Sequence, residues 1–121
     1  MITSDSQMLN IMFNNMMDNA RKYSQDQSRI EVAILRKTHG TQPGYQVSVS
    51  NLPGDAGFPD PEHVFDKYYR SPQAHRQIGS GLGLFLVSGL ARLLGGEIRY
   101  ESDETHVRFV LWLPIHPFKS V

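Results

Sequence analysis

Two asparagines and a lysine at helical spacing are the first residues in this sequence whose types could bind a ligand. Asn15, Asn19 and Lys22 fall within a sector of about 60° if residues 9–24 form a helix, because successive residues turn by about 100°. Amides at the edge of a buried face are costly unless a polar partner meets them, and that partner is either solvent or a ligand. They flank an apolar stripe with three- and four-residue steps, which must face a core: Met8, Leu9, Met12, Phe13, Met16, Met17 and Ala20.

The glycine-rich segment GSGLGL, residues 79–84, is the second candidate for chemistry. Glycines allow the backbone to approach a ligand closely, and the free N–H groups at the start of a helix suit a phosphate. No lysine follows the segment, so it is not a GxxxxGK[ST] phosphate loop. A plain glycine-rich connection before a core helix is the structural alternative.

A dinucleotide-binding fold is a rival interpretation of the same glycines. Glu101 ends a predicted strand about twenty residues further on, where a ribose-binding acid would lie. However, Leu84 occupies the place of the third glycine, and SPQAHRQI before the glycines does not resemble a buried strand. Too few residues follow to complete a doubly wound sheet.

Composition places the chain among ordinary single-domain globular proteins. It has 121 residues, 40% of them hydrophobic, and a formal net charge of +0. The balanced charge gives no reason to expect a nucleic acid or a membrane surface as partner. With no cysteine, the chain has neither a disulfide framework nor a cysteine-rich zinc site. We expect one domain over residues 1–121, with no apolar run long enough to cross a bilayer.

The elements that must position these residues alternate between helices and strand pairs. The first helix has Asp5 as a candidate N-cap, and a second, apolar nearly all round, begins at the glycines and ends before Gly95 and Gly96. We place this second helix in the middle of the core. Strands are expected at Ile30–Lys37, Tyr45–Asn51, Glu97–Ser102 and His106–Leu113. This order predicts an α+β fold, a two-layer sandwich with helices on one face of a mixed, mostly antiparallel sheet.

Together these motifs resemble the catalytic, ATP-binding domain of bacterial sensor histidine kinases, whose Bergerat fold is shared with DNA gyrase. The resemblance runs from Asp5 to Pro114 and includes a final strand similar to FVLWLP. It rests on three motifs in order. The N box is matched by Asp5, Leu9, Met12, Asn15, Asn19, Ala20, Lys22 and Tyr23, the F box by Phe65, Tyr68 and Arg70, and the G2 box by Gly79, Ser80, Gly81, Leu82, Gly83 and Leu84.

The resemblance implies ATP and Mg²⁺ as cofactors. Asn15 would hold the metal through its amide oxygen, in line with the oxygen ligands that Mg²⁺ prefers. Asn19 would contact the phosphates or the metal, Lys22 would neutralise phosphate charge, and Tyr23 would pack against the adenine. Arg70 would donate to the γ-phosphate, because a guanidinium suits bidentate contact with phosphate. The segment 58–80 would be an ATP lid, and Gly79, Gly81 and Gly83 would form its hinge and phosphate contacts.

The sequence departs from the family where an aspartate usually accepts a hydrogen bond from the adenine amino group. Asn51 takes that place, at the end of a strand and on the same face as Val47 and Val49, so we expect its side chain at the rim of the core. Gly54 and Gly57 would serve as the glycines of this G1 box. An amide oxygen can still accept from adenine but carries no charge, so we expect weaker binding, and Asn51→Asp should tighten it.

The same resemblance indicates transfer of phosphate. Hydrolysing relatives carry a glutamate four residues before the metal-binding asparagine, and Ile11 stands there instead. The implied activity is phosphorylation of a histidine on a separate dimerisation domain, with a response regulator downstream. The whole protein would be a homodimeric inner-membrane sensor with this domain in the cytoplasm. Two alternatives remain: a degenerate module that acts as a regulatory or dimerising surface, and an ATPase of the gyrase type, which Ile11 disfavours.

Overall fold

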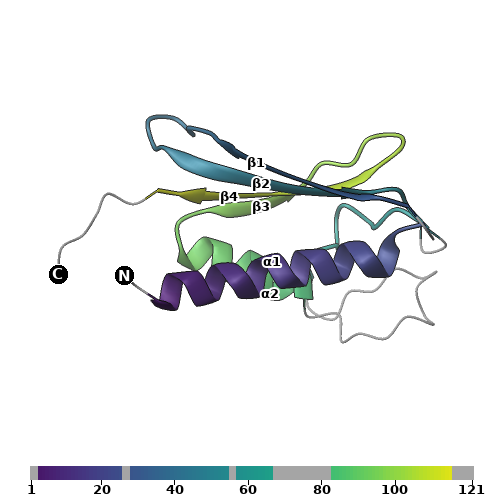
Figure 1. The fold of residues 1–121 in the computed structure, drawn as a ribbon, viewed down its shortest axis with the longest axis horizontal. Coiled ribbons are helices and arrows are strands. Elements are labelled where there is room, and N and C mark those ends of the chain that lie inside the picture. The colour runs from purple at the N-terminus through teal and green to yellow at the C-terminus, as the bar shows by residue number, and fades with distance from the viewer. Residues whose placement is uncertain (1–2, 26–27, 55–56, 67–82, 116–121) are drawn as a thin grey trace.

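The computed structural model describes residues 3–25, 28–54, 57–66 and 83–115. These residues form two layers, a four-stranded sheet in the order β1-β2-β4-β3 and two helices that cover one of its faces (Figure 1). The predicted α+β sandwich is confirmed. The elements are α1 (Thr3–Tyr23), β1 (Ile30–Arg36), β2 (Gly44–Asn51), α2 (Gly83–Leu93), β3 (Glu97–Tyr100) and β4 (Val107–Pro114).

Helix α1 buries the middle of the apolar stripe that its sequence period predicts, but the prediction that Leu9 faces the core is wrong, because its side chain is 42% exposed. Met12, Met16 and Ala20 are at most 2% exposed and belong to the core cluster. Phe13 and Met17 pack against this cluster from the side. The helix begins at Thr3, so the prediction that Asp5 is its N-cap is wrong, because Asp5 lies inside the first turn.

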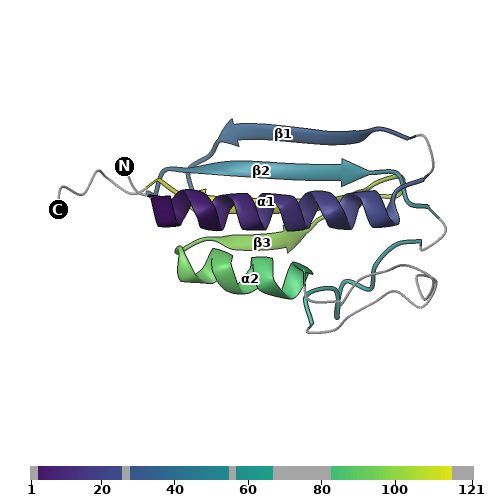
Figure 2. The ribbon, with the colours of Figure 1, turned by 60° about the horizontal axis from the view of Figure 1, so that its bottom comes forward.

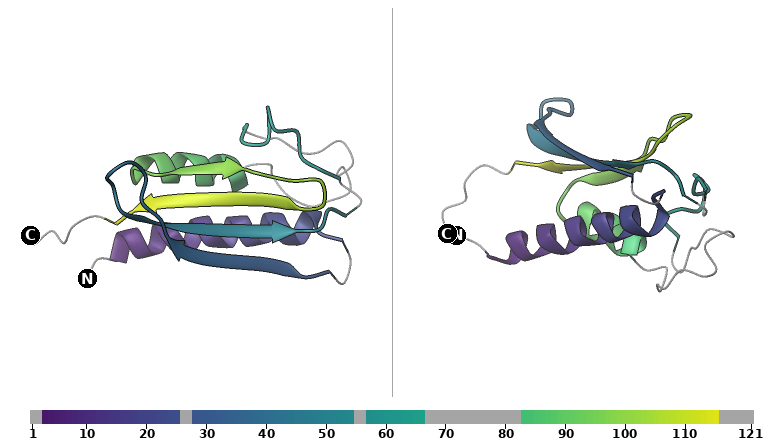
Figure 3. Two further views of the ribbon diagram at one scale, coloured as in Figure 1. Left: turned by 90° about the horizontal axis from the view of Figure 1, so that it is seen from above. Right: turned by 45° about the vertical axis from the view of Figure 1, so that its right-hand side comes forward.

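Neighbouring strands of the sheet pair antiparallel at every position that the structure describes. Val32 lies opposite Val49, and Val49 lies opposite Phe109. Viewed towards the helices, β1 forms one edge and β3 the other (Figures 2 and 3). The parallel pair that a mixed sheet would need is absent from the described strands.

Helix α2 lies beside α1 on the sheet, and the described part of the chain covers only one of its faces. Leu84, Val87 and Ala91 are buried against the core, whereas Phe85 is 44% and Leu93 69% exposed. The prediction that this helix lies in the middle of the core is therefore wrong. Its sequence is apolar on both faces, and composition alone does not show which face meets a neighbour.

Glycine ends α2 as predicted. Gly95 has a φ of 86°, which favours glycine, and the N–H of Gly96 donates to the carbonyl of Ala91 at 2.8 Å. A Cβ at Gly96 would lie 2.0 Å from the backbone oxygen of Trp112. Position 96 therefore requires glycine, because the chain that leaves α2 passes close to the backbone of β4.

The open face of the sheet carries Trp112, held at the end of the β1–β2 hairpin. Its indole N–H donates to the carbonyl of Lys37 at 2.8 Å. The ring of His39 stacks on it with centroids 4.0 Å apart. Trp112 is 5% exposed and fastens the hairpin loop to β4.

Candidate functional site

The two motifs separated most widely in the sequence meet where α1 passes the start of α2. The side-chain oxygen Oδ1 of Asn15 would lie 3.0 Å from a Cβ at Gly83. The other amide atom, Nδ2, donates to the carbonyl of Ile11 at 2.7 Å, which fixes the orientation of the group. The half-buried Asn15 therefore presents its oxygen towards the first residue of α2, and no described residue donates to that oxygen.

An amide oxygen in this position suits a hard cation. Mg²⁺ takes oxygen ligands and keeps several waters, so a single protein amide oxygen fits its preferences. The absence of a side chain at Gly83 matters for this oxygen, because a Cβ there would crowd Asn15. The structure thus brings the predicted metal ligand Asn15 next to the predicted phosphate-contact residue Gly83.

The remaining N-box residues continue along the same flank of α1. Asn19 and Lys22 are half-buried, and neither side chain makes a hydrogen bond or ion pair with another described residue. Tyr23 ends the helix and is 8% exposed. The flank derived from helical spacing is therefore present, with its amides and ammonium accessible at the edge of the core.

Asn51 occupies a different setting from the one predicted. Its amide donates to two backbone carbonyls, that of Tyr23 at 3.3 Å and that of Leu52 at 3.0 Å, and it is 1% exposed. The prediction that it lies at the rim of the core is wrong, because it is buried. It fastens the last turn of α1 to the end of β2. The signal in the sequence was a polar residue on the core face of a strand, since such a residue needs internal partners.

The glycines that follow Asn51 have structural reasons to be glycine. The N–H of Gly54 donates to the carbonyl of Tyr23 at 2.8 Å, and a Cβ there would lie 2.6 Å from the backbone oxygen of Ser24. Gly57 has a φ of 71°, and its N–H donates to the carbonyl of Gly54 at 3.0 Å. Their role as nucleotide-binding glycines stays a prediction.

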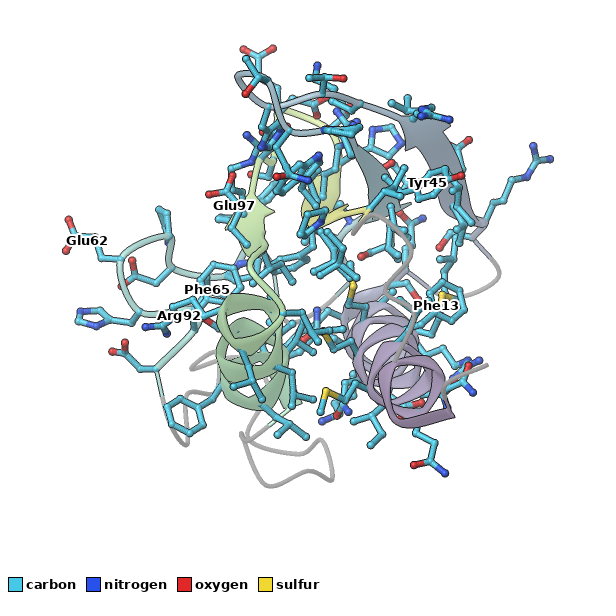
Figure 4. The ribbon with its side chains drawn as sticks, turned by 90° about the vertical axis from the view of Figure 1, so that its left-hand side faces the viewer. Phe13, Tyr45, Glu62, Phe65, Arg92 and Glu97 are labelled. Atoms are coloured by element: carbon cyan, nitrogen blue, oxygen red, sulfur yellow. The ribbon has the colours of Figure 1, made fainter. Side chains whose placement is uncertain are left out.

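The first part of the predicted lid is anchored to the core. Val64 is 2% exposed, and the ring of Phe65 meets that of Phe109 edge-on at 5.8 Å. Figure 4 shows Phe65 on the α2 side of the molecule, below the strands. The other predicted residues of the F and G2 boxes lie outside the described residues: Tyr68, Arg70, Gly79, Ser80, Gly81 and Leu82.

Among the residues that the structure describes, two exposed groups have shifted pKa values, and both lie in turns. A hydrogen bond from His63 to Asp66, at 2.8 Å, raises the pKa of His63, with the charge of Asp60 adding to the effect. Backbone N–H groups of Thr105 and His106 donate to Asp103 and hold the pKa of its carboxyl below the ordinary value.

A shallow groove of about 620 Å³ lies on the sheet face away from the helices. Its floor includes Ala33, Ser48 and Ser50, and its sides carry Arg29 and Arg108. None of the predicted site residues lines this groove. It is thus a surface separate from the α1–α2 junction.

Comparison with known proteins identifies the family once this geometry is known. Residues 4–117 match the family described as "Histidine kinase-, DNA gyrase B-, and HSP90-like ATPase". The chain belongs to this ATPase family. It is 29% identical over 119 residues to the sensor histidine kinase HprS of Escherichia coli, and 33% identical over 118 residues to the swarming motility regulation sensor protein RssA of Serratia marcescens. Each alignment covers 93% of this chain and 24% of the relative.

Solved structures agree with the sequence relatives. The mycobacterial sensor histidine kinase MprB superposes with a TM-score of 0.76 at 26% identity, over 93% of this chain and 76% of that one. The catalytic domain of the histidine kinase ThkA shares the fold, with a TM-score of 0.63 at 22% identity, over 89% of this chain and 67% of that one. The predicted resemblance is confirmed: this is the ATPase domain found in sensor histidine kinases. It spans about a quarter of the length of those sequence relatives, and none of its described helices is long and apolar enough to span a membrane.

Proposed function

We propose that the chain binds Mg-ATP where α1 meets α2 and supports transfer of the γ-phosphate to a histidine of a separate domain. The observation that carries this proposal is the position of Asn15 Oδ1 over Gly83. When bound, Mg²⁺ would neutralise phosphate charge, and Asn15 would provide one of its oxygen ligands.

The other roles follow the flank of α1. Lys22 would hold phosphate oxygens, Asn19 would contact the phosphates or the metal, and Tyr23 would pack against the adenine. The G2-box backbone and Arg70 would contact the phosphates from the lid side, over residues 58–80. The family match over residues 4–117 supports these assignments together with the accessible amides of α1.

Ile11 supports transfer over hydrolysis. The apolar side chain of Ile11 cannot take a proton from water. The backbone carbonyl of Ile11 accepts a hydrogen bond from the side-chain amide of Asn15. In the transfer, the bond between the γ-phosphorus and the bridging oxygen of ADP breaks while a phosphorus–nitrogen bond to imidazole forms. The chain's own groups would position the phosphate and exclude water.

The relatives' names extend this proposal to the whole protein. Sensor kinases of about four times this length imply further domains that carry the acceptor histidine and the signal input. A homodimeric sensor in the inner membrane, with this domain in the cytoplasm and a response regulator as the downstream partner, completes the proposed assignment.

One observation favours an alternative, a regulatory module with weak or no nucleotide binding. Asn51 replaces the adenine-binding aspartate, and its amide is committed to Tyr23 and Leu52 inside the protein. If the adenine contact depends on this side chain, burial leaves little of it accessible.

Calorimetric titration of ATP and ADP, with and without Mg²⁺, tests the proposal. We expect saturable binding with dissociation constants between about 1 µM and 1 mM, tightened by Mg²⁺. Asn15→Ala should abolish the effect of Mg²⁺, whereas Asn14→Ala, an exposed neighbour on the same helix, should retain it. Absence of binding by the unaltered chain would favour the regulatory module, and an unchanged Mg²⁺ effect in Asn15→Ala would remove the metal role.

A further inference from the structure

Two backbone hydrogen bonds fasten the end of helix α1 to the segment that follows β2. The N–H of Gly54 donates to the carbonyl of Tyr23 at 2.8 Å, and the N–H of Gln25 donates to the carbonyl of Leu52 at 2.9 Å. Strand β2 is an inner strand of the sheet, paired on both sides. The end of α1 is therefore tied to a rigid part of the fold, and we call this contact the α1–β2 junction.

The side chain of Asn51 completes the α1–β2 junction from inside the protein. Its amide Nδ2 donates to the carbonyl of Tyr23 at 3.3 Å and to that of Leu52 at 3.0 Å. These are the same two carbonyls that accept the backbone hydrogen bonds. A carbonyl oxygen has two lone pairs and an amide nitrogen has two hydrogens, so all of them are used here.

The junction lies next to a residue proposed to bind phosphate. Lys22 directly precedes Tyr23, in the last turn of α1. The last carbonyls of a helix have no acceptor role within the helix, so a last turn keeps its place only through groups outside it. The position of the Lys22 ammonium therefore depends on the donors that reach the carbonyl of Tyr23.

We propose that Asn51 is a positioning residue for the nucleotide site, which holds the last turn of α1 and thereby Lys22 in place. This role rests on the proposed function, because it requires that the flank of α1 binds phosphate. It also replaces a direct contact with adenine, since both amide hydrogens point into the protein and the residue is 1% exposed. An aspartate at position 51 cannot donate to either carbonyl, so it should weaken nucleotide binding.

Calorimetric titration with Mg-ATP, at a temperature where every variant is folded, distinguishes a positioning residue from an adenine acceptor. Asn51→Ala and Asn51→Asp should both bind at least about threefold more weakly than the unaltered chain, because each loses the two hydrogen bonds of the side chain. An adenine acceptor would give the opposite order, with the aspartate variant binding more tightly. Tighter binding by Asn51→Asp, or unchanged affinity in Asn51→Ala, would overturn the proposal.

Trp112→Phe is the matched control for lost stability. It also removes a side-chain N–H donor of a buried residue, here to the carbonyl of Lys37, but on the sheet face opposite the helices. The variant should be less stable and yet bind Mg-ATP as the unaltered chain does. A loss of affinity as large as that of Asn51→Ala would show that affinity follows stability alone, which contradicts a positioning role.

A double-mutant cycle shows whether Asn51 acts through Lys22. Once Lys22 is replaced by alanine, the position of the last turn matters less, so adding Asn51→Ala should weaken binding by less than about twofold. Asn15 is the comparison, because it lies about 12 Å along the helix from Tyr23. Asn51→Ala should keep its full effect in the Asn15→Ala background. Full additivity with Lys22→Ala would refute the positioning role.

Amide hydrogen exchange tests the junction without nucleotide. In Asn51→Ala the amides of Gln25 and Gly54 should exchange at least about tenfold faster relative to that of Met16, in the middle of α1, whereas Trp112→Phe should leave this ratio unchanged. An unchanged ratio in Asn51→Ala overturns the inference whether or not the chain binds nucleotide. Absence of Mg-ATP binding by the unaltered chain refutes the proposed function and this role together, whereas binding that the Asn51 variants do not weaken refutes this role alone.

Discussion

Replacing Asn51 by aspartate should destabilise the protein. The amide donates to the carbonyls of Tyr23 and Leu52, and an ionised carboxylate cannot donate to either. The change leaves two carbonyl oxygens facing a negative charge at a site that is 1% exposed. Two lost hydrogen bonds with the desolvation of the charge cost about 2–4 kcal/mol at pH 7. For a domain of this size we expect the melting temperature to fall by about 8–15 °C.

The pH dependence separates this cause from a general defect. Burial and the nearby carbonyls raise the pKa of the new carboxyl above its unfolded value, so the penalty is present at neutral pH. The part of the penalty that comes from the charge shrinks as the pH falls through the folded pKa and is absent below the unfolded pKa of about 3.9, whereas one of the two hydrogen bonds stays lost because a protonated carboxyl has a single donor. Urea unfolding of both proteins at pH 7 and pH 5 measures the difference.

The same chemical change at an exposed site provides the control. Asn14→Asp lies on the exposed side of α1 and should shift stability by less than about 0.5 kcal/mol. If Asn51→Asp is as stable as the original at pH 7, the hydrogen-bond argument is refuted. That result would favour the prediction that Asn51 accepts a hydrogen bond from adenine and that aspartate at this position tightens nucleotide binding.

Three other changes test separate contacts. Gly83→Ala should keep the fold but weaken Mg²⁺-dependent nucleotide binding, because its Cβ would crowd the amide oxygen 3.0 Å away; equal binding in calorimetry would contradict this. Gly96→Ala should lower the free energy of unfolding, measured in urea, by more than about 3 kcal/mol, because its Cβ would collide with the backbone of β4. Gly89→Ala, whose Cβ would meet no neighbour, should raise it by about 0.5–1 kcal/mol. Asp66→Asn should lower the pKa of His63, measured by NMR titration. The variant should also lose the stabilisation that protonated His63 provides, which is fully present below its unfolded pKa and is lost as the pH rises through the folded pKa. An unchanged pKa would argue against the hydrogen bond.

Local patterns predicted the elements well. The three- and four-residue period of α1, with Met12 and Met16 at its centre, and the two-residue period of β2 each specify a buried face without knowledge of the neighbours. Antiparallel pairing of β1 with β2 follows from their short connection. The flank with Asn15 and Asn19 was visible for the same reason.

Contacts between distant segments were not predictable in this way. The buried setting of Asn51 depends on how the end of α1 meets β2, which no local pattern specifies. The exposed face of α2 and the uncovered residues of β1 show the same limit, because an apolar residue such as Ile34 or Leu93 does not reveal whether a neighbour covers it. The meeting of Asn15 with Gly83 was predicted only through the family resemblance.

The stacking of His39 on Trp112 gives the chain a built-in optical probe. Trp112 is the single tryptophan, so its emission reports on the hairpin and on β4 alone. Because the ring lies on the sheet face opposite the helices, nucleotide bound between α1 and α2 should leave the signal unchanged while unfolding alters it. Fluorescence would therefore measure the integrity of the sheet independently of whether the nucleotide site is filled.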